Sequence, residues 1–257
     1  MNISLEDKVT VITGGTRGIG LSIAKVFGEN GSKIAICGRS ESNINHAIKE
    51  LEADGIEVLG MKADVSNEKE LINFADEVEK KYGGIDIWIN NAGIYPLVKM
   101  LDMSLQDWEQ LFDINVKSVF IGSKIAKEKL MKRKGGVIIN AASFASIMPS
   151  VTAGAYAATK SAVYSMTKSL AAELAPHNIR VLGYIPGVID TEMNKKLLEK
   201  NNKAIIDPLA MKRAGTVEEV AYPLLFLASE YASYITGTFI EISGGKFCVQ
   251  NPSAVWE

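Results

Sequence analysis

Short apolar runs rich in Val and Ile alternate along this chain with longer stretches of helical pattern. Most of these runs are continuously apolar, which is typical of strands that are covered on both faces. Strands are expected at 9–12, 33–37, 57–61, 85–89, 136–140, 179–185 and 238–242. Strict alternation of strand and helix predicts a parallel sheet with helices on both faces. We therefore expect an α/β fold with a seven-stranded parallel sheet.

Six stretches of helical pattern lie between the expected strands. Helices are expected near 18–30, 41–54, 67–82, 105–134, 153–177 and 217–230. Two of them are predicted to begin with a capping box, in which a hydroxyl and an acid three residues later bond reciprocally. The two pairs are Ser104 with Asp107 and Thr216 with Glu219.

The segment at about 187–215 has the weakest strand or helix pattern in the chain. It follows Pro186-Gly187 and interrupts the alternation of strands and helices. An insertion of this length beside a sheet is typically functional, so we expect a substrate lid. No linker, repeat or low-complexity segment is visible, and residues 1–257 are expected to form a single domain.

The composition excludes several classes of function. The 257 residues include 28 basic and 30 acidic side chains, so nothing pulls the chain towards nucleic acid or an anionic membrane. No apolar run approaches the ~18–20 residues that cross a bilayer, and the first residues do not form a signal peptide. Cys37 and Cys248 cannot build a disulfide framework, and His46 and His177 are too few for most histidine metal sites. We expect a cytoplasmic protein with no metal, no nucleic-acid partner and no membrane partner.

A glycine-rich turn follows the first expected strand. The sequence TGGTRGIG runs from Thr13 to Gly20 and leads into a helix. Gly14, Gly18 and Gly20 have no Cβ, so the backbone can turn tightly and approach a ligand closely. The N-terminus of the helix favours a pyrophosphate there, because its free N–H groups and positive dipole end face the turn. On the first strand of such an alternation, the turn predicts a dinucleotide site in a Rossmann fold.

The end of the second expected strand indicates which dinucleotide binds. An NAD site usually places an acid there, whereas this chain has Cys37-Gly38-Arg39-Ser40. Arg39 and Arg17 can instead meet a 2′-phosphate, for which a guanidinium has the right geometry, or they are solvated surface charges. NADP(H) is therefore favoured over NAD(H). Asp64, after the third strand, lies near the adenine or only caps a helix.

Four further motifs follow the glycine-rich turn. They are NNAG at 90–93, Asn115 within INV, Ser143 before the pentapeptide YAATK at 156–160, and Pro186-Gly187 followed by Thr191. In this order and spacing, they make the chain resemble the short-chain dehydrogenase/reductase family over nearly its whole length.

Tyr156 and Lys160 stand four residues apart in YAATK, so on a helix they share one face. A free tyrosine has a pKa of about 10 and exchanges its proton poorly at neutral pH. We expect the nearby ammonium to lower the pKa of Tyr156 towards the range that acid–base catalysis needs. Ser143 lies just past a strand, where its hydroxyl can stabilise a substrate oxygen as negative charge develops.

The resemblance adds roles that the residues alone do not give. It implies that Lys160 also binds the ribose of the nicotinamide, and that Asn115 holds a water that passes protons between Lys160 and solvent. The catalytic residues are then Asn115, Ser143, Tyr156 and Lys160. The expected cofactor-binding residues are Gly14, Thr16, Arg17, Gly18, Ile19, Gly20, Arg39, Asp64, Val65, Asn91, Ala92, Gly93, Tyr156, Lys160, Pro186, Gly187, Val188 and Thr191. The expected substrate-binding residues are Ser143, Tyr95, Phe144, Met148, Tyr156 and Met193.

The expected reaction is transfer of a hydride from NADPH to the carbonyl of a hydrophobic ketone or 3-oxoacyl substrate. The resemblance is strongest to 3-oxoacyl-acyl-carrier-protein reductases and related carbonyl and hydroxysteroid reductases. The alternative is an NAD(P)-dependent alcohol dehydrogenase acting on a hydroxysteroid, a polyol or another secondary alcohol. The resemblance also implies a homotetramer.

A basic cluster suggests acyl carrier protein as a partner. It comprises Lys127, Lys129, Lys132, Arg133 and Lys134. These cations can steer an acidic carrier protein, or they only complement the dipole at the end of a helix.

Two features depart from the pattern of the family. Leu182 follows Arg180-Val181 where an Asn is usual, and Tyr184-Ile185 precedes the proline where smaller or aliphatic residues are common. The chain also continues beyond SGGK to Trp256-Glu257, a tail that packs across a subunit interface or is frayed. These departures leave the proton and hydride chemistry intact and weaken the case for a carrier-protein substrate.

Overall fold

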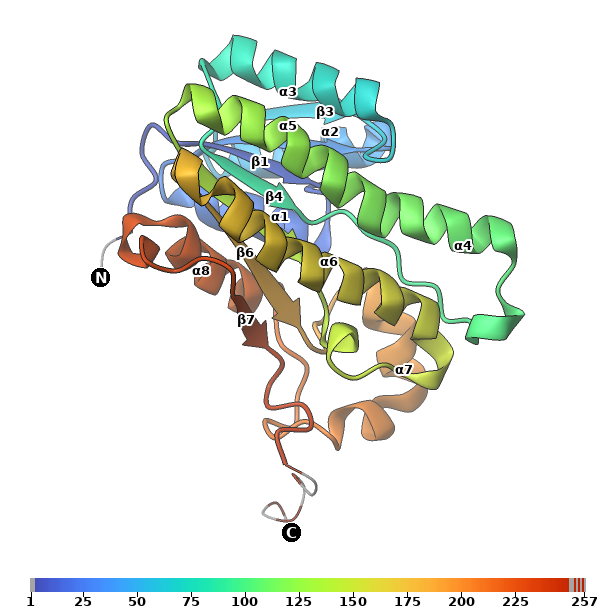
Figure 1. Ribbon diagram of the computed structural model, residues 1–257. Helices are drawn as coiled ribbons and strands as arrows, with labels where there is room; N and C mark the ends of the chain where they lie inside the picture. The colour runs from blue at the N-terminus through green and yellow to red at the C-terminus, as the bar shows by residue number, and fades with distance from the viewer. Residues whose placement is uncertain (1–2, 250–251, 253, 255, 257) are drawn as a thin grey trace.

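The computed structural model describes residues 3–249, 252, 254 and 256, except for the side chains at 196, 197 and 200–202. Its centre is one seven-stranded sheet in the order β3-β2-β1-β4-β5-β6-β7, and every adjacent pair of strands is parallel (Figure 1). The strands are β1 (Val9–Thr13), β2 (Lys33–Gly38), β3 (Val58–Lys62), β4 (Ile87–Asn90), β5 (Gly136–Ala141), β6 (Ile179–Pro186) and β7 (Phe239–Ile242). The prediction of a seven-stranded parallel sheet is confirmed.

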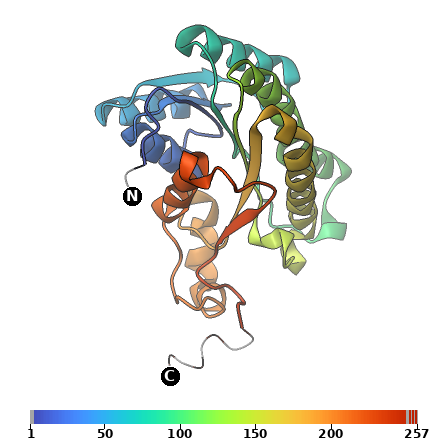
Figure 2. The ribbon, with the colours of Figure 1, turned by 60° about the vertical axis from the view of Figure 1, so that its left-hand side comes forward.

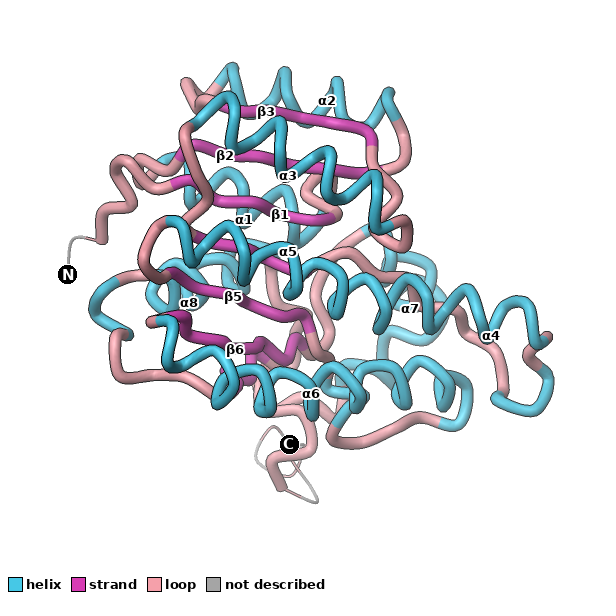
Figure 3. The backbone as a smooth tube through the Cα atoms, turned by 45° about the horizontal axis from the view of Figure 1, so that its top comes forward, coloured by secondary structure: helices cyan, strands magenta, loops and turns pink. Residues whose placement is uncertain are grey.

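Helices cover both faces of the sheet, as the alternation predicted. The α-helices are α1 (Gly18–Glu29), α2 (Glu41–Ala53), α3 (Glu68–Tyr82), α4 (Leu105–Phe112), α5 (Ser118–Lys132), α6 (Gly154–Leu174), α7 (Glu192–Ile206) and α8 (Val217–Ala228). Figure 2 shows the blue and red helices on one side of the sheet and the green and yellow helices on the other. In Figure 3, α3, α5 and α6 cross in front of the strands.

Two buried cores fill the space between the sheet and its two helical layers. Consecutive side chains of β1 alternate between them: Val11 packs with α3, α5 and α6, whereas Ile12 packs with α1, α2 and α8. This alternation follows from the two-residue period of a strand. Because both faces are buried, the strands carry continuous apolar runs.

The long helix expected at 105–134 is interrupted in the structure. Between α4 and α5 lies one π-helical turn, Asp113–Lys117, which contains Asn115. A π turn inserts one residue into the helical ladder and is frequent at functional sites. The Thr216 capping box is confirmed at the start of α8. At Ser104 only half of the expected box forms. Its hydroxyl caps α4 by accepting the Asp107 N–H at 3.1 Å, but the Asp107 carboxylate accepts from that hydroxyl at 2.7 Å and not from the Ser104 backbone.

The segment expected at 187–215 contains a helix that the sequence pattern did not predict, α7. Both ends of the segment are tied to each other by a parallel bridge between Ile189 and Gly215. The Gly215 N–H donates to the Val188 carbonyl at 2.9 Å, and the Asp190 N–H donates to the Gly215 carbonyl at 2.8 Å. Figure 1 shows α7 in orange beyond the end of β6.

Trp256, near the C-terminal end, contacts this segment. Trp256 donates its indole N–H to the Ala210 carbonyl at 3.1 Å, although its side chain is largely exposed. The expected contact of this tryptophan with another subunit stays a prediction, and Glu257 lies outside the described residues.

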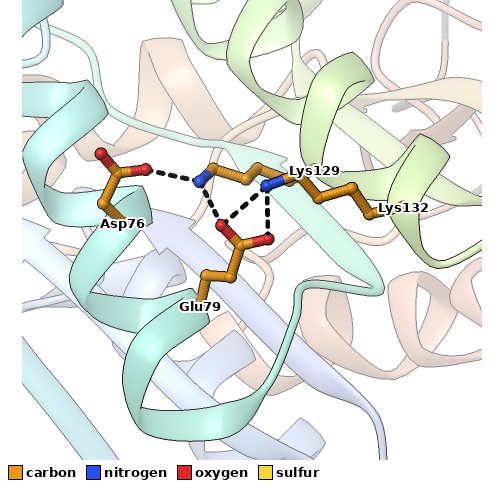
Figure 4. A network of polar contacts seen from close by, with 4 residues as sticks. All are labelled: Asp76, Glu79, Lys129 and Lys132. Carbon is orange, nitrogen blue, oxygen red and sulfur yellow. Dashed lines mark hydrogen bonds and ion pairs between the residues drawn. The ribbon is translucent and has the colours of Figure 1, made fainter.

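An ion network joins α3 to α5 (Figure 4). Lys129, whose side chain is only 9% exposed, contacts Asp76 and donates to Glu79 at 2.7 Å. Lys132 shares Glu79 at 2.9 Å. Arg133 pairs separately with the nearly buried Asp86 at 3.1 Å. Three cations of the basic cluster therefore neutralise acids of their own chain.

Candidate active site

A cavity of about 450 Å³ lies at the carboxyl edge of the sheet. Parallel strands bring their carboxyl ends to one edge, which is where open α/β sheets bind ligands. Its wall includes a residue at or just after the end of each strand from β1 to β6: Gly14, Gly38, Ala63, Asn91, Ala141 and Pro186. All the expected cofactor-binding residues lie on this wall.

The glycine-rich turn has the geometry that a phosphate needs. Gly14 and Gly18 have φ of +66° and +54°, in the left-handed region that favours glycine. A Cβ on Gly20 would come within 2.3 Å of the Gly14 carbonyl oxygen, so the turn and the first turn of α1 touch there. By contrast, a Cβ on Gly18 would meet no described atom closer than the Thr191 methyl at 3.6 Å. The open backbone at the N-terminus of α1 fits the pyrophosphate of a dinucleotide.

Two arginines lie on the part of the wall where an adenosine ribose is expected. Arg39 is exposed just beyond β2, and its charge lowers the pKa of Asp64. Burial, the largest single influence, raises that pKa, but hydrogen bonds from Ser66 and the charges of Arg39 and Lys117 together hold the pKa of Asp64 below its usual value. Arg17 is placed differently from expectation, because its guanidinium contacts the Glu192 carboxylate of α7 at 3.4 Å.

Tyr156 and Ser143 meet in the middle of the cavity wall. Burial raises the pKa of Tyr156 to about 12, while a hydrogen bond with Ser143 opposes the shift. Ser143 accepts the Ala145 N–H at 3.2 Å, which leaves its own proton to donate. Tyr95 packs its ring on that of Tyr156, with 4.6 Å between the centroids.

Lys160 lies one helical turn from Tyr156 and is 4% exposed. Its ammonium donates to the Ala141 carbonyl at 2.8 Å and lies 5.8 Å from the centre of the Tyr156 ring. Burial lowers the pKa of Lys160 to about 8. The expected lowering of the pKa of Tyr156 is wrong in this structure, because desolvation of the phenol outweighs any effect of the ammonium.

Asn115 is fully buried next to the cavity and not on its wall. Its amide accepts the Ile94 N–H at 2.9 Å and donates to the Ile94 carbonyl and to Thr159. Both amide hydrogens are thereby used, and one lone pair on Oδ1 is left. A Cβ on Gly93 would lie 3.3 Å from this oxygen and 3.6 Å from the Lys160 nitrogen. The water-holding role of Asn115 stays a prediction.

The outer part of the cavity has a mostly apolar wall. Tyr95, Met148 and Met193 lie on it, as predicted. Phe144 does not: it is buried behind the wall, where Lys246 lies 5.0 Å from the centre of its ring. The prediction that Phe144 contacts substrate is therefore corrected.

Several residues on the wall were not predicted for the site. The most informative are Ile94, Ser150, Ala153, Tyr184 and Asn194. Ile94 adjoins the NNAG motif, and Tyr184 is a hydroxyl-bearing residue near the end of an apolar strand, so both had a sequence signal. Asn194 belongs to α7, which the pattern did not predict.

The comparisons with known proteins agree with this geometry. The family model described as short chain dehydrogenase matches residues 8–202, which include the glycine-rich turn, Ser143, Tyr156 and Lys160. The chain belongs to the short-chain dehydrogenase family. As a member, it is an oxidoreductase of carbonyl or alcohol groups that binds a nicotinamide coenzyme.

Relatives of this short-chain dehydrogenase span nearly its whole length. The 3-oxoacyl-[acyl-carrier-protein] reductase FabG of Aquifex aeolicus is 37% identical over 248 residues, or 96% of this chain and 100% of that protein. The 3alpha-hydroxysteroid dehydrogenase of Mediterraneibacter gnavus is 35% identical over 247 residues, or 95% of this chain and 98% of that protein. A 7α-hydroxysteroid dehydrogenase structure, complexed with NADH and 7-oxo glycochenodeoxycholic acid, matches with a TM-score of 0.92 at 30% identity. That match covers 97% of this chain and 98% of the other.

Two classes of site are not found in the part of the chain that the structure describes. There, no group of three or more His, Cys, Asp or Glu side chains is arranged to hold a metal ion. Within the same residues, no helix combines the length and apolar character needed to cross a membrane.

The buried ammonium of this short-chain dehydrogenase predicts a stability that depends on pH. Because the folded pKa of Lys160 is lowered from 10.5 to about 8, the unfolded chain binds more protons between these values. Stability should therefore rise with pH across this window. At pH 7, Lys160→Met should raise the free energy of unfolding, by up to about 3 kcal/mol at roughly 1.4 kcal/mol per pKa unit.

Denaturant unfolding at pH 7, 8, 9 and 10 measures this effect. The advantage of Lys160→Met should shrink steadily above pH 8. Exposed Lys168, on the same helix, is the matched control, and Lys168→Met should change stability by less than about 0.5 kcal/mol at every pH. A Lys160→Met protein no more stable than wild type at pH 7 would contradict the prediction.

Proposed function

We propose that this short-chain dehydrogenase reduces the carbonyl of a hydrophobic ketone or 3-oxoacyl compound with NADPH, giving a secondary alcohol. The observation that carries the proposal is the placement of the Tyr156 phenol beside the Ser143 hydroxyl, on the wall of the same cavity as the glycine-rich turn. A coenzyme on the turn and a carbonyl at the phenol would thus share one space.

Tyr156 is the proposed proton donor. With its pKa raised to about 12, the phenol carries its proton at neutral pH, which is the form that reduction requires. When bound, reduced nicotinamide supplies the hydride to the carbonyl carbon. Tyr156 gives its proton to the carbonyl oxygen, and Ser143 donates a hydrogen bond to that oxygen as it gains negative charge. Lys160 is proposed to bind the nicotinamide ribose.

A preference for NADPH rests on the end of β2. The exposed guanidinium of Arg39 lies on the cavity wall where the 2′-phosphate is expected. Arg17 supports the preference less, because it contacts Glu192.

The substrate is proposed to be a hydrophobic ketone or 3-oxoacyl compound that is not bound to a carrier protein. Tyr95, Met148 and Met193 give the outer cavity an apolar wall. The basic cluster that could steer a carrier protein is largely neutralised, because Lys129, Lys132 and Arg133 pair with acids of their own chain. This charge compensation favours the alternative that these cations stabilise the end of their own helix and do not bind a partner.

A second candidate function is oxidation of a hydroxysteroid or another secondary alcohol with NAD(P)⁺. Two of the relatives described above are named as hydroxysteroid dehydrogenases, and one of these was solved with NADH. The apolar wall suits a steroid better than a polyol. In this direction, Tyr156 would have to release its proton first, which a pKa of about 12 opposes at neutral pH.

Three further properties are proposed from the same observations. The α7 segment would act as a lid, because it contributes Glu192, Met193 and Asn194 to the cavity wall. A homotetramer in the cytoplasm remains the proposed state. Exposed Leu105 on α4 and Phe120 on α5 support an assembly, since they are 73% and 57% accessible.

Replacement of the proton donor tests the mechanism. Tyr156→Phe should lower kcat by at least about 100-fold, because a positioned acid contributes on the order of 10²–10⁴. The Kd for NADPH should change less than about threefold, since the phenol's proton is not needed for coenzyme binding. Tyr164→Phe, on the same helix but outside the cavity, should keep wild-type kcat. Retention of most activity by Tyr156→Phe would reject its role.

Removal of the guanidinium at the end of β2 tests coenzyme choice. Arg39→Ala should raise the Kd for NADPH about tenfold, the equivalent of one lost charge-assisted contact, and leave the Kd for NADH nearly unchanged. Fluorescence titration measures both constants. Lys49→Ala removes an exposed cation of α2 outside the cavity and should alter neither. Equal effects on the two coenzymes would show that Arg39 does not recognise the phosphate.

A substrate panel separates the two functions. Absorbance at about 340 nm follows both coenzymes with 3-oxoacyl thioesters, steroid ketones, small cyclic ketones and the matching alcohols. We expect a higher kcat/KM for reduction of a ketone or free thioester than for oxidation of any alcohol at pH 7. The kcat/KM for a carrier-bound thioester should exceed that for the free thioester by less than about tenfold. A kcat/KM more than about 100-fold higher for the carrier-bound thioester would show that a carrier protein is the partner after all.

A further inference from the structure

Tyr184 brings a polar group into the apolar strand β6 at the cavity wall. The residue is 1% exposed and its ring belongs to the core that α1 and α8 cover. A buried hydroxyl needs a hydrogen-bond partner. The Tyr184 hydroxyl donates to Oδ1 of Asn91 at 2.9 Å, although β5 separates β6 from the strand that Asn91 follows.

The side chain of Asn91 links this hydroxyl to the glycine-rich turn. Its Nδ2 donates to the carbonyl oxygens of Thr13 at 3.0 Å and Gly14 at 3.1 Å. Its backbone N–H donates to the Thr13 hydroxyl at 3.0 Å. Because both amide hydrogens point at carbonyls, Oδ1 must face Tyr184 and accept from it. Burial raises the pKa of Tyr184 far above neutrality, so the hydroxyl remains a donor.

The amide of Asn91 is also packed tightly under the turn. A Cβ on Gly20 would come within 2.5 Å of Nδ2, and one on Gly14 would come within 2.9 Å of Ala92 Cα. The amide thus fills the space between the end of β1 and the first turn of α1. Any rotation of this side chain would push against the backbone that is expected to hold the pyrophosphate.

We propose that Tyr184 is a positioning residue of the coenzyme site: its hydroxyl fixes the Asn91 amide, which holds the glycine-rich turn in its phosphate-binding conformation. The inference rests on the dinucleotide-binding part of the proposed function. Tyr184 acts through Asn91 and transfers no proton itself. Its effect is therefore on the affinity for the part of the coenzyme that NADH and NADPH share.

A phenylalanine at this position keeps the ring and removes only the donor. Oδ1 of Asn91 then loses the hydrogen bond from the Tyr184 hydroxyl, and the amide is no longer held in one orientation. An unpaired, partly buried carbonyl oxygen is unfavourable, so the amide would turn or admit water. Either change would loosen its two bonds to Thr13 and Gly14, and the turn would become more mobile.

The test compares Tyr184→Phe with a matched control, Tyr82→Phe. The Tyr82 hydroxyl also donates to a buried strand, at 3.4 Å from the Ile34 carbonyl, but lies outside the cavity. Without substrate, Tyr184→Phe should raise the Kd for NADH and for NADPH about tenfold each. With saturating coenzyme, kcat should stay within about twofold of wild type. Tyr82→Phe should change neither quantity.

Hydrogen exchange gives a second readout that needs no coenzyme. Amides in peptides that cover 13–20 should exchange faster in Tyr184→Phe than in wild type and in Tyr82→Phe. A role confined to core packing would lower the melting temperature and leave both the Kd and the local exchange unchanged. That result would overturn the inference.

A double-mutant cycle decides whether Tyr184 acts through Asn91. In the Asn91→Ala background, the further change Tyr184→Phe should no longer raise the Kd for either coenzyme, because the link is already broken. A tenfold effect that persists in this background would refute the pathway through Asn91. If wild type bound neither coenzyme, the proposed function would fail, whereas the exchange comparison would still test the link between Tyr184 and the turn.

Discussion

Burial of polar groups at one edge of a parallel sheet is the constraint on which this structure depends. Strands β1 to β6 bring their carboxyl ends to the cavity, so backbone carbonyls and polar side chains gather there. Among the described residues, no buried side-chain nitrogen or oxygen lacks a hydrogen-bond partner. Asn90 and Asn140 illustrate how: their amides bond to each other at 2.8 Å between β4 and β5, and Asn140 continues to Thr167 on α6 at 3.0 Å. The site is thereby held by the same bonds that hold the sheet to its helices.

Lys160 shows where stability and chemistry diverge. Its ammonium is surrounded by protein and has one described hydrogen-bond acceptor, the Ala141 carbonyl. Desolvation makes the charged form unfavourable, whereas a coenzyme ribose would give it further acceptors. A fold selected for stability alone would place an apolar side chain at this position. Desolvation favours the neutral form of Tyr156 as well, but because the neutral phenol is the protonated form, its pKa is raised and not lowered.

Much of the fold and of the site could be predicted from the sequence. Apolar runs rich in Val and Ile located all seven strands, and most of these runs are continuous, as is typical of a strand buried on both faces. The glycines at 14, 18 and 20 and the Tyr156–Lys160 spacing located the site, because backbone conformation and helical period restrict them directly. The π turn around Asn115 could not be found in this way, because its extra residue leaves the apolar pattern continuous. The helix α7 was hidden by its many polar residues. The partners of Lys129 and Arg133 lie about 50 positions away along the chain, beyond the reach of any local pattern.

The bridge between Ile189 and Gly215 has a consequence for how this enzyme can diversify. It brings two distant points of the chain together, so the segment between them, which contains α7, is anchored at both ends beside the sheet. The entropic penalty of closing a loop grows only slowly with its length. Segments of other lengths and compositions can therefore be accommodated between these two anchors, and the cavity can be reshaped for a new substrate without refolding the scaffold that carries Tyr156.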